Sequence, residues 1–217
     1  MNRFINWICR FVPTHFSNRL FLFCLQFMRR IQRNGRILAM GSGESSWDEE
    51  GFIENQINMK NIHMGMATIA EAGCEIIATY NVLYNVGKKV QLDKLIRIFV
   101  RDGILHSGKY GVAPQAIADC LKKNGCDVHT YIPGRKRQDV DGFTDMYETI
   151  VLTYYNDATD LMKEIHTIAV TRLEGGFVAH NAHCNGAVEV NCGKITDLIS
   201  IITSGKGKIL MAIGVNG

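Results

Sequence analysis

Three residues far apart in the chain have the side chains that catalysis by a thiol requires: Cys74, His166 and Asn181. A thiol with an ordinary pKa is mostly protonated at neutral pH, so a neighbouring imidazole must take its proton before the sulfur attacks a carbonyl. A third polar group must hold that imidazole in one tautomer and orientation. The chain therefore contains a candidate nucleophile, a candidate general base and a candidate orienting amide.

Cys74 directly follows Ala72-Gly73 and begins a predicted helix that runs to about residue 86. Apolar residues recur there at helical spacing, and Gly87 ends the pattern. A thiolate at a helix N-terminus is stabilised by the helix dipole, and the unpaired N–H groups there can also hold an oxyanion. The simpler alternative is a buried apolar cysteine that happens to begin a helix.

His166 and Asn181 lie on two predicted strands, 166–173 and 177–182, joined through Glu174-Gly175-Gly176. A two-residue turn at Glu174-Gly175 would pair Leu173 with Gly176 and, further along, Ile168 with Asn181. The strands would then form a tight hairpin. A three-residue turn would place the asparagine on the wrong face.

The two-residue register pairs His166 with His183 and places Asn181 on the same sheet face, one diagonal step from His166. His180 then points to the opposite face. We therefore expect the amide oxygen of Asn181 to accept a hydrogen bond from the imidazole. The alternative is that His166 is an ordinary sheet histidine and Asn181 belongs to a turn.

These motifs resemble those of a known family. The segment Ala72-Gly-Cys-Glu-Ile-Ile-Ala-Thr-Tyr-Asn81, the strand His166-Thr-Ile-Ala-Val and the hairpin to Asn181 are similar to papain-like cysteine peptidases. Among these, the chain resembles the bacterial bacteriocin-processing (double-glycine leader) peptidases in stand-alone form, over roughly residues 55–217. The resemblance implies a papain-like fold, a Cys-His-Asn triad, a thioester acyl-enzyme, a peptide or protein substrate and no cofactor.

Such peptidases carry a glutamine a few residues before the cysteine, which helps to hold the oxyanion. Thr68 occupies that place here, and Gln56 or Asn61 would have to fold back to serve instead. We expect the backbone N–H of Cys74 to be one oxyanion donor and Thr68 or Gln56 to be the other.

Other functions remain open from these residues. The same Cys–His pair would support acyl transfer or deamidation, because nucleophiles other than water can capture a thioester. The fold could also serve as a catalytically weak or inactive peptide-binding module. A structural zinc site is a further alternative, from His180, His183, Cys184 and Cys192. We predict no metal, since the two histidines fall on opposite faces of a strand and no CxxC pair is present.

Helices precede strands along most of the chain, which predicts an α+β fold with N-terminal helices packed on a mostly antiparallel sheet. The predicted helices cover residues 74–86, 92–101, 114–123, 157–164 and 194–203. The predicted strands cover residues 127–132, 148–155, 166–173, 177–182 and 208–215.

The N-terminal 42 residues carry seven arginines and no acid, whereas the whole chain has a formal net charge of +3. The rest of the chain therefore has no basic excess, and we expect no nucleic-acid partner. We expect an Arg-rich helical arm over residues 1–40 and the peptidase domain over residues 50–217. The oligomeric state is left open.

The arm has one apolar run, residues 20–28, which is too short to span a bilayer. Two arginines follow it, unlike the cleavage site of a signal peptide. Residues 1–36 could contact a membrane surface, pack on the body or a second chain, or be a removable pro-segment. The odd number of cysteines, seven, fits a reducing compartment. We expect a cytoplasmic protein, with membrane association as an option.

Overall fold

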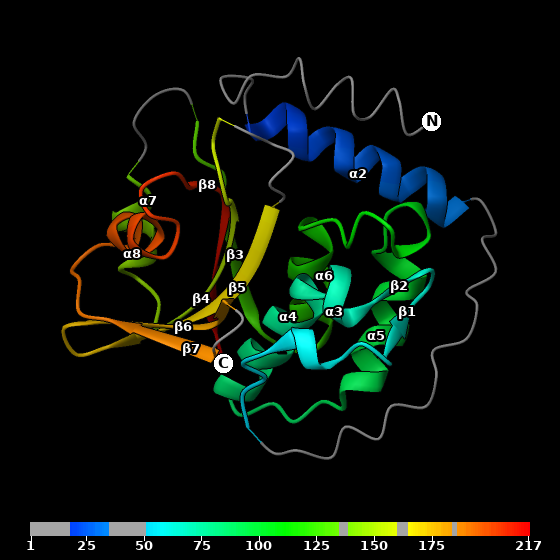
Figure 1. Cartoon of the computed structure of the whole chain (residues 1–217), viewed down its shortest axis with the longest axis horizontal. Coiled ribbons are helices and arrows are strands. Elements are labelled where there is room, and N and C mark those ends of the chain that lie inside the picture. Colours follow the sequence, from blue (N-terminus) through cyan, green and yellow to red (C-terminus); the bar gives the residue numbers. More distant parts are fainter. Residues whose placement is uncertain (1–17, 35–50, 135–138, 160–164, 184–185) are drawn as a thin grey trace.

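The computed structural model describes residues 18–34, 51–134, 139–159, 165–183 and 186–217 and shows an α+β protein (Figure 1). Six strands form one antiparallel sheet in the order β3-β8-β4-β5-β6-β7. Their bounds are β3 (Asp127–Tyr131), β4 (Thr149–Tyr155), β5 (Ile165–Leu173), β6 (Gly176–His183), β7 (Gly186–Val190) and β8 (Lys208–Asn216). The predicted α+β class is confirmed.

Helices α4 (Cys74–Asn85) and α6 (Gln115–Lys123) pack on one face of the sheet, and α5 (Leu92–Asp102) packs on these two helices. Helix α4 packs mainly on β5 and also contacts α5 and α6. Nine of its residues are buried, because neighbours surround it on several sides. Its first residue is thereby fixed against the middle of the sheet.

Two short helices, α7 (Val140–Thr144) and α8 (Ile195–Ile202), cover the other face. Alternate residues of β4 therefore enter two different cores: Val151 and Tyr155 face the α4 side, and Leu152 and Tyr154 face the α8 side. All seven residues of β4 are buried, as expected for a strand that is covered on both faces.

The N-terminal region supplies the remaining elements. These are α2 (Asn18–Asn34), the 3₁₀ turn η1 (Gln56–Asn58), the strand pair β1 (His63–Met64) and β2 (Ala67–Thr68), α3 (Ile69–Ala72) and the 3₁₀ turn η2 (His106–Gly108). Figure 1 shows α2 lying across the outside of the helical layer. None of the helices in the described ranges combines the length and apolar character that crossing a bilayer requires.

Most predicted elements agree with the structure, but β1, β2, β7, α3, α7 and the two 3₁₀ turns were not anticipated. Residues 157–159 form a turn where a helix was predicted, and the rest of that segment lies outside the described residues. So do the first 17 residues of the arm, the joint that follows it, and Cys184. Pro114, the first residue of the predicted helix 114–123, occupies the N-cap position of α6.

Candidate active site

Cys74 is the first residue of α4 and is 7% exposed. The preceding Gly73 closes α3 through a hydrogen bond from its N–H to Ile69 O. A Cβ at Gly73 would lie 2.8 Å from backbone atoms of Ile69, so only glycine lets α3 and α4 meet this closely. The Cys74 N–H, at the first helical position, has no acceptor within its own helix. It therefore suits the predicted role of oxyanion donor.

The Cys74 thiol lies against β5. Its sulfur is within hydrogen-bonding range of the backbone N–H of Thr167, the residue after His166. Tyr154, which pairs with His166 across β4 and β5, interacts electrostatically with Cys74. The rings of Tyr154 and His166 meet edge to face, 5.9 Å apart between centroids. The structure thus brings Cys74 to the same short stretch of sheet as His166.

The His166 ring is held by a backbone group. Its Nε2 lies 2.8 Å from the carbonyl oxygen of Asn181. A carbonyl oxygen only accepts hydrogen bonds, so Nε2 carries the proton and Nδ1 is the basic nitrogen of the neutral ring. This contact selects the tautomer that a general base needs.

The side chain of Asn181 does not make the predicted contact with His166. Its Oδ1 accepts a hydrogen bond from the Gln56 N–H at 3.0 Å, and its Nδ2 donates to Gln56 Oε1 at 2.7 Å. The expected route through the amide oxygen is therefore corrected: the carbonyl of Asn181 contacts the imidazole, and the amide ties β6 to η1.

Backbone conformation explains this correction. The predicted turn is right, and the β5–β6 ladder begins with Leu173 opposite Gly176. It ends at Ala169 opposite His180, because Asn181 adopts a left-handed conformation with φ of 58°. The expected pairs Ile168–Asn181 and His166–His183 do not form. Beyond Ala169 the carbonyl of Asn181 is turned toward His166.

The electrostatics of Cys74 favour the protonated thiol. Burial raises its pKa well above the ordinary value, and the charge of Glu75 raises it further, while the bond from Thr167 N–H opposes both. The thiol donates to Glu75 Oε2 at 3.3 Å. In the resting site the sulfur is therefore an uncharged donor, and attack on a carbonyl requires its proton to leave.

Glu75 is the acid that sequence reasoning missed. It is 7% exposed, and burial raises its pKa to about 7. Hydrogen bonds from backbone N–H groups, including that of Val112, and from the thiol lower it only in part. The one available signal was an acid directly after a cysteine at a helix start. Its burial depends on the loop at Val112.

The two predicted side-chain oxyanion donors have other partners. Thr68 caps α3: its hydroxyl donates to Glu71 Oε2 at 3.0 Å and accepts from Glu71 N–H at 3.3 Å. Gln56 does fold back, but its Nε2 lies 3.4 Å from Ile69 O and from Ala70 O, on the short helix before Cys74. Asn61 is exposed.

His180 belongs to a separate polar cluster on the α4 side of the sheet, opposite to the face of His166, because its pair partner Ala169 lies in the α4-side core. Its Nδ1 lies 2.6 Å from Glu54 Oε1, its Nε2 lies 3.0 Å from Thr171 Oγ1, and its ring stacks on Phe52 at 3.9 Å. Glu54 Oε2 also accepts from Asn181 N–H at 2.9 Å. Among the described residues, no group of three or more His, Cys, Asp or Glu side chains is arranged to hold a metal ion.

Comparison with known proteins adds no relative to this picture: no family model matches the chain, and no curated protein or solved structure matches it either.

Proposed function

We propose that the chain is a cysteine peptidase with a papain-like arrangement, which cleaves a peptide or protein substrate through a thioester acyl-enzyme. Cys74 is the nucleophile and His166 the general base. Asn181 orients the imidazole through its carbonyl. The observation that carries the proposal is the 2.8 Å contact between His166 Nε2 and Asn181 O, because it leaves Nδ1 as the basic nitrogen on the strand whose next residue, Thr167, contacts the Cys74 thiol.

In the first step the Cys74 proton passes to His166 Nδ1 as the sulfur attacks the substrate carbonyl. The resulting oxyanion is held by the Cys74 N–H. The imidazolium then protonates the leaving amine, the C–N bond breaks and a thioester remains. In the second step His166 removes a proton from water, which attacks the thioester. The C–S bond breaks, the acid product leaves, and the imidazolium returns the proton to the sulfur.

A catalytically weak or inactive peptide-binding module is the second candidate. The raised pKa of the Cys74 thiol and its contact with Glu75 favour this reading, because both oppose formation of a thiolate. Hydrolysis and acyl transfer share the thioester step, so the test below addresses both.

Labelling by a peptidyl acyloxymethyl ketone, located by mass spectrometry, separates an enzyme from a binding module. We expect rapid alkylation of Cys74, with loss of that label in Cys74→Ser. Cys24 is a matched control, because it is an exposed free thiol and should react without help from a base. Labelling of Cys74 no faster than of Cys24 would overturn the proposal.

A further inference from the structure

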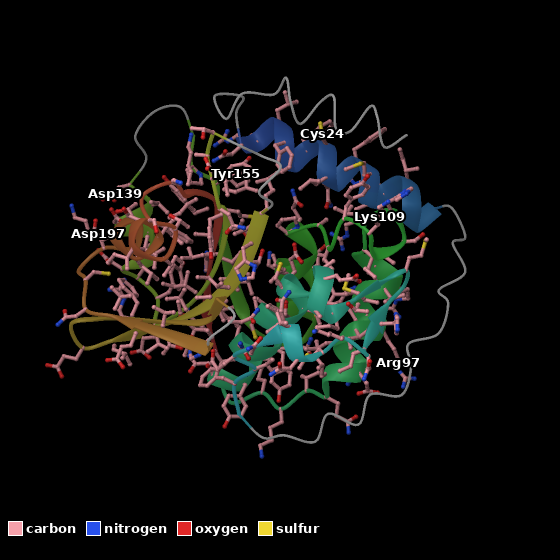
Figure 2. The ribbon with its side chains drawn as sticks, in the orientation of Figure 1. Cys24, Arg97, Lys109, Asp139, Tyr155 and Asp197 are labelled. Carbon is pink, nitrogen blue, oxygen red and sulfur yellow. The ribbon has the colours of Figure 1, made fainter. Side chains whose placement is uncertain are left out.

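The exposed face of α2 is apolar. Leu20, Phe23, Phe27 and Ile31 are 46%, 64%, 55% and 55% exposed, and their spacing of three and four residues places them on one side of the helix. We call these four residues the α2 stripe. Cys24, labelled in Figure 2, is also exposed on this helix. Large apolar side chains that gather on one exposed face mark a contact surface.

The buried face of α2 is unusually polar. Arg29 is only 5% exposed; its Nη1 lies 2.8 Å from Asp119 Oδ2, and its Nε donates to Asp102 O. Asn18 is also 5% exposed and donates from Nδ2 to Pro133 O at 3.2 Å and to Ile209 O at 3.3 Å. Amphipathic helices normally turn their polar side outward. Here an arginine faces the body and two phenylalanines face away.

These contacts fix the rotation of α2 about its axis. Leu22 is 1% exposed on the same inner face, and Gln115 Nε2 donates to its carbonyl at 2.7 Å. Phe21 packs on Tyr155 of β4, with 6.1 Å between the ring centroids. Turning the stripe inward would expose Leu22 and leave Asp119 and the Asp102 carbonyl without Arg29. The body therefore holds the stripe outward.

The charges around the stripe indicate what it contacts. Arg19 and Arg30 are exposed, and their separation of about three helical turns places them along one edge of the stripe. Neither α2 nor the rest of residues 1–42 contains an acid. Antiparallel pairing with a second copy through the stripe would bring Arg19 near Arg30 without a counter-charge. An anionic lipid surface supplies both the apolar layer and the negative charge.

We propose that α2 is a membrane-surface helix that docks the protein on anionic phospholipid, with the α2 stripe inserted at the headgroup boundary and Arg19 and Arg30 against lipid phosphates. This inference does not depend on the peptidase proposal, because it uses none of the residues around Cys74. It also explains how α2 can pack on the body and leave its aromatic side chains in the open.

Co-sedimentation of the full chain with vesicles tests the proposal. One vesicle type is phosphatidylcholine with roughly 30% phosphatidylglycerol, a moderately anionic surface. We expect the protein to bind these mixed vesicles at least about tenfold more tightly than vesicles of pure phosphatidylcholine. Phe23→Asp/Phe27→Asp should weaken binding to the mixed vesicles by at least about tenfold. Arg19→Gln/Arg30→Gln should weaken it by roughly 30-fold and reduce its dependence on salt.

The matched control is Met146→Asp/Ile201→Asp, which changes two side chains that are 65% and 54% exposed on other elements. It should leave vesicle binding unchanged. Unaltered binding by the phenylalanine variant would overturn the proposal. If the parent protein does not bind vesicles, two other results would also overturn it. A parent dimer that the phenylalanine variant dissociates would assign the α2 stripe to a contact with a second copy. A lower melting temperature of the phenylalanine variant would assign the stripe to packing by residues 1–17.

Discussion

His166 and His180 lie on neighbouring strands of one sheet, on opposite faces, in contrasting surroundings. His180 is held at both ring nitrogens, by Glu54 and Thr171, and its ring is stacked on Phe52. His166 is held at Nε2 by a carbonyl oxygen and packs edge-on against Tyr154. The first arrangement holds the segment that contains Phe52 and Glu54 against the sheet. The second presents a defined tautomer next to the strand residue that contacts a thiol.

The two regions share Asn181. Its N–H donates to Glu54 in the His180 cluster, and its carbonyl accepts from His166. Its left-handed backbone is what allows one residue to serve both faces of the sheet. The comparison teaches that hydrogen-bond partners, rather than residue type, distinguish a candidate base from a structural histidine.

The largest expected effect is on the reactivity of Cys74. His166→Ala should slow alkylation of Cys74 by a peptidyl electrophile by roughly 10²- to 10⁴-fold, because the proposed mechanism makes His166 the proton acceptor of the thiol. The rate is measured by intact mass against time. His180→Ala, corrected for the folded fraction, should stay within about threefold of the parent rate. If folded His166→Ala and folded His180→Ala lose the same reactivity at Cys74, the distinction between a candidate base and a structural histidine is wrong.

The next effect concerns the pH dependence of stability. Burial raises the pKa of Glu75 from 4.5 to about 7, so the folded state holds a proton that the unfolded state releases. This stabilisation is complete below pH 4.5 and is lost as the pH rises through 7. Glu75→Gln should therefore remove roughly 3 kcal/mol of pH-dependent change in the free energy of unfolding. Urea unfolding at pH 4.5 and pH 8 measures the change. If the free energy of unfolding changes equally between these two pH values in the parent and in the variant, the prediction is wrong.

The same variant sharpens the description of the thiol. Without the carboxylate charge, the pKa of Cys74 should fall, and the pH profile of its alkylation should move to lower pH. Glu71→Gln is the matched control, since this acid lies in the same region but on the exposed cap of α3. A profile that shifts in both variants would mean that the contact with Glu75 is not the cause.

A smaller effect is expected on the His180 side of the comparison. His180→Ala should destabilise the protein by about 2 kcal/mol, because it removes the stacking on Phe52 and leaves Glu54 without its imidazole partner. Urea unfolding at pH 7 provides the measurement. His129→Ala is the control: His129 is exposed and bonds Asp127 at 3.3 Å, so its loss should change stability little. Equal effects of the two substitutions would show that the contacts of His180 do not stabilise the fold.

The smallest expected effect tests the role of Asn181. Glycine tolerates a φ of 58° and keeps the carbonyl. In Asn181→Gly, the peptidyl electrophile should therefore alkylate Cys74 at a rate within about fivefold of the parent rate. The glycine variant should lose about 1 kcal/mol of stability, because the hydrogen bond between the Asn181 amide and Gln56 is removed. Asn181→Ala should lose more, because alanine is strained at this φ. A drop of about 100-fold in the glycine variant would assign the orienting role to the side chain instead.

Local patterns predicted much of the framework. The start of α4 at Cys74, the two-residue turn at Glu174-Gly175 and the opposite orientations of His166 and His180 all follow from periodicity over a few residues. The strand β7 was missed because residues 186–190 are mostly half-buried and exposed, without the apolar run that marked the central strands. Short helices such as α3 also lie below what periodicity can detect.

The sequence by itself determined the helix, the hairpin and the residue types that these elements carry, since these depend on spacing and turn chemistry. Only the tertiary structure decided that the Asn181 carbonyl, rather than its amide, reaches His166, because Gln56, 125 residues away, holds the amide. The burial of Glu75 and the outward turn of the α2 stripe were decided in the same way, by Val112 and by contacts of Arg29 with distant residues. Contacts between segments far apart in the chain select among orientations that local spacing leaves equivalent.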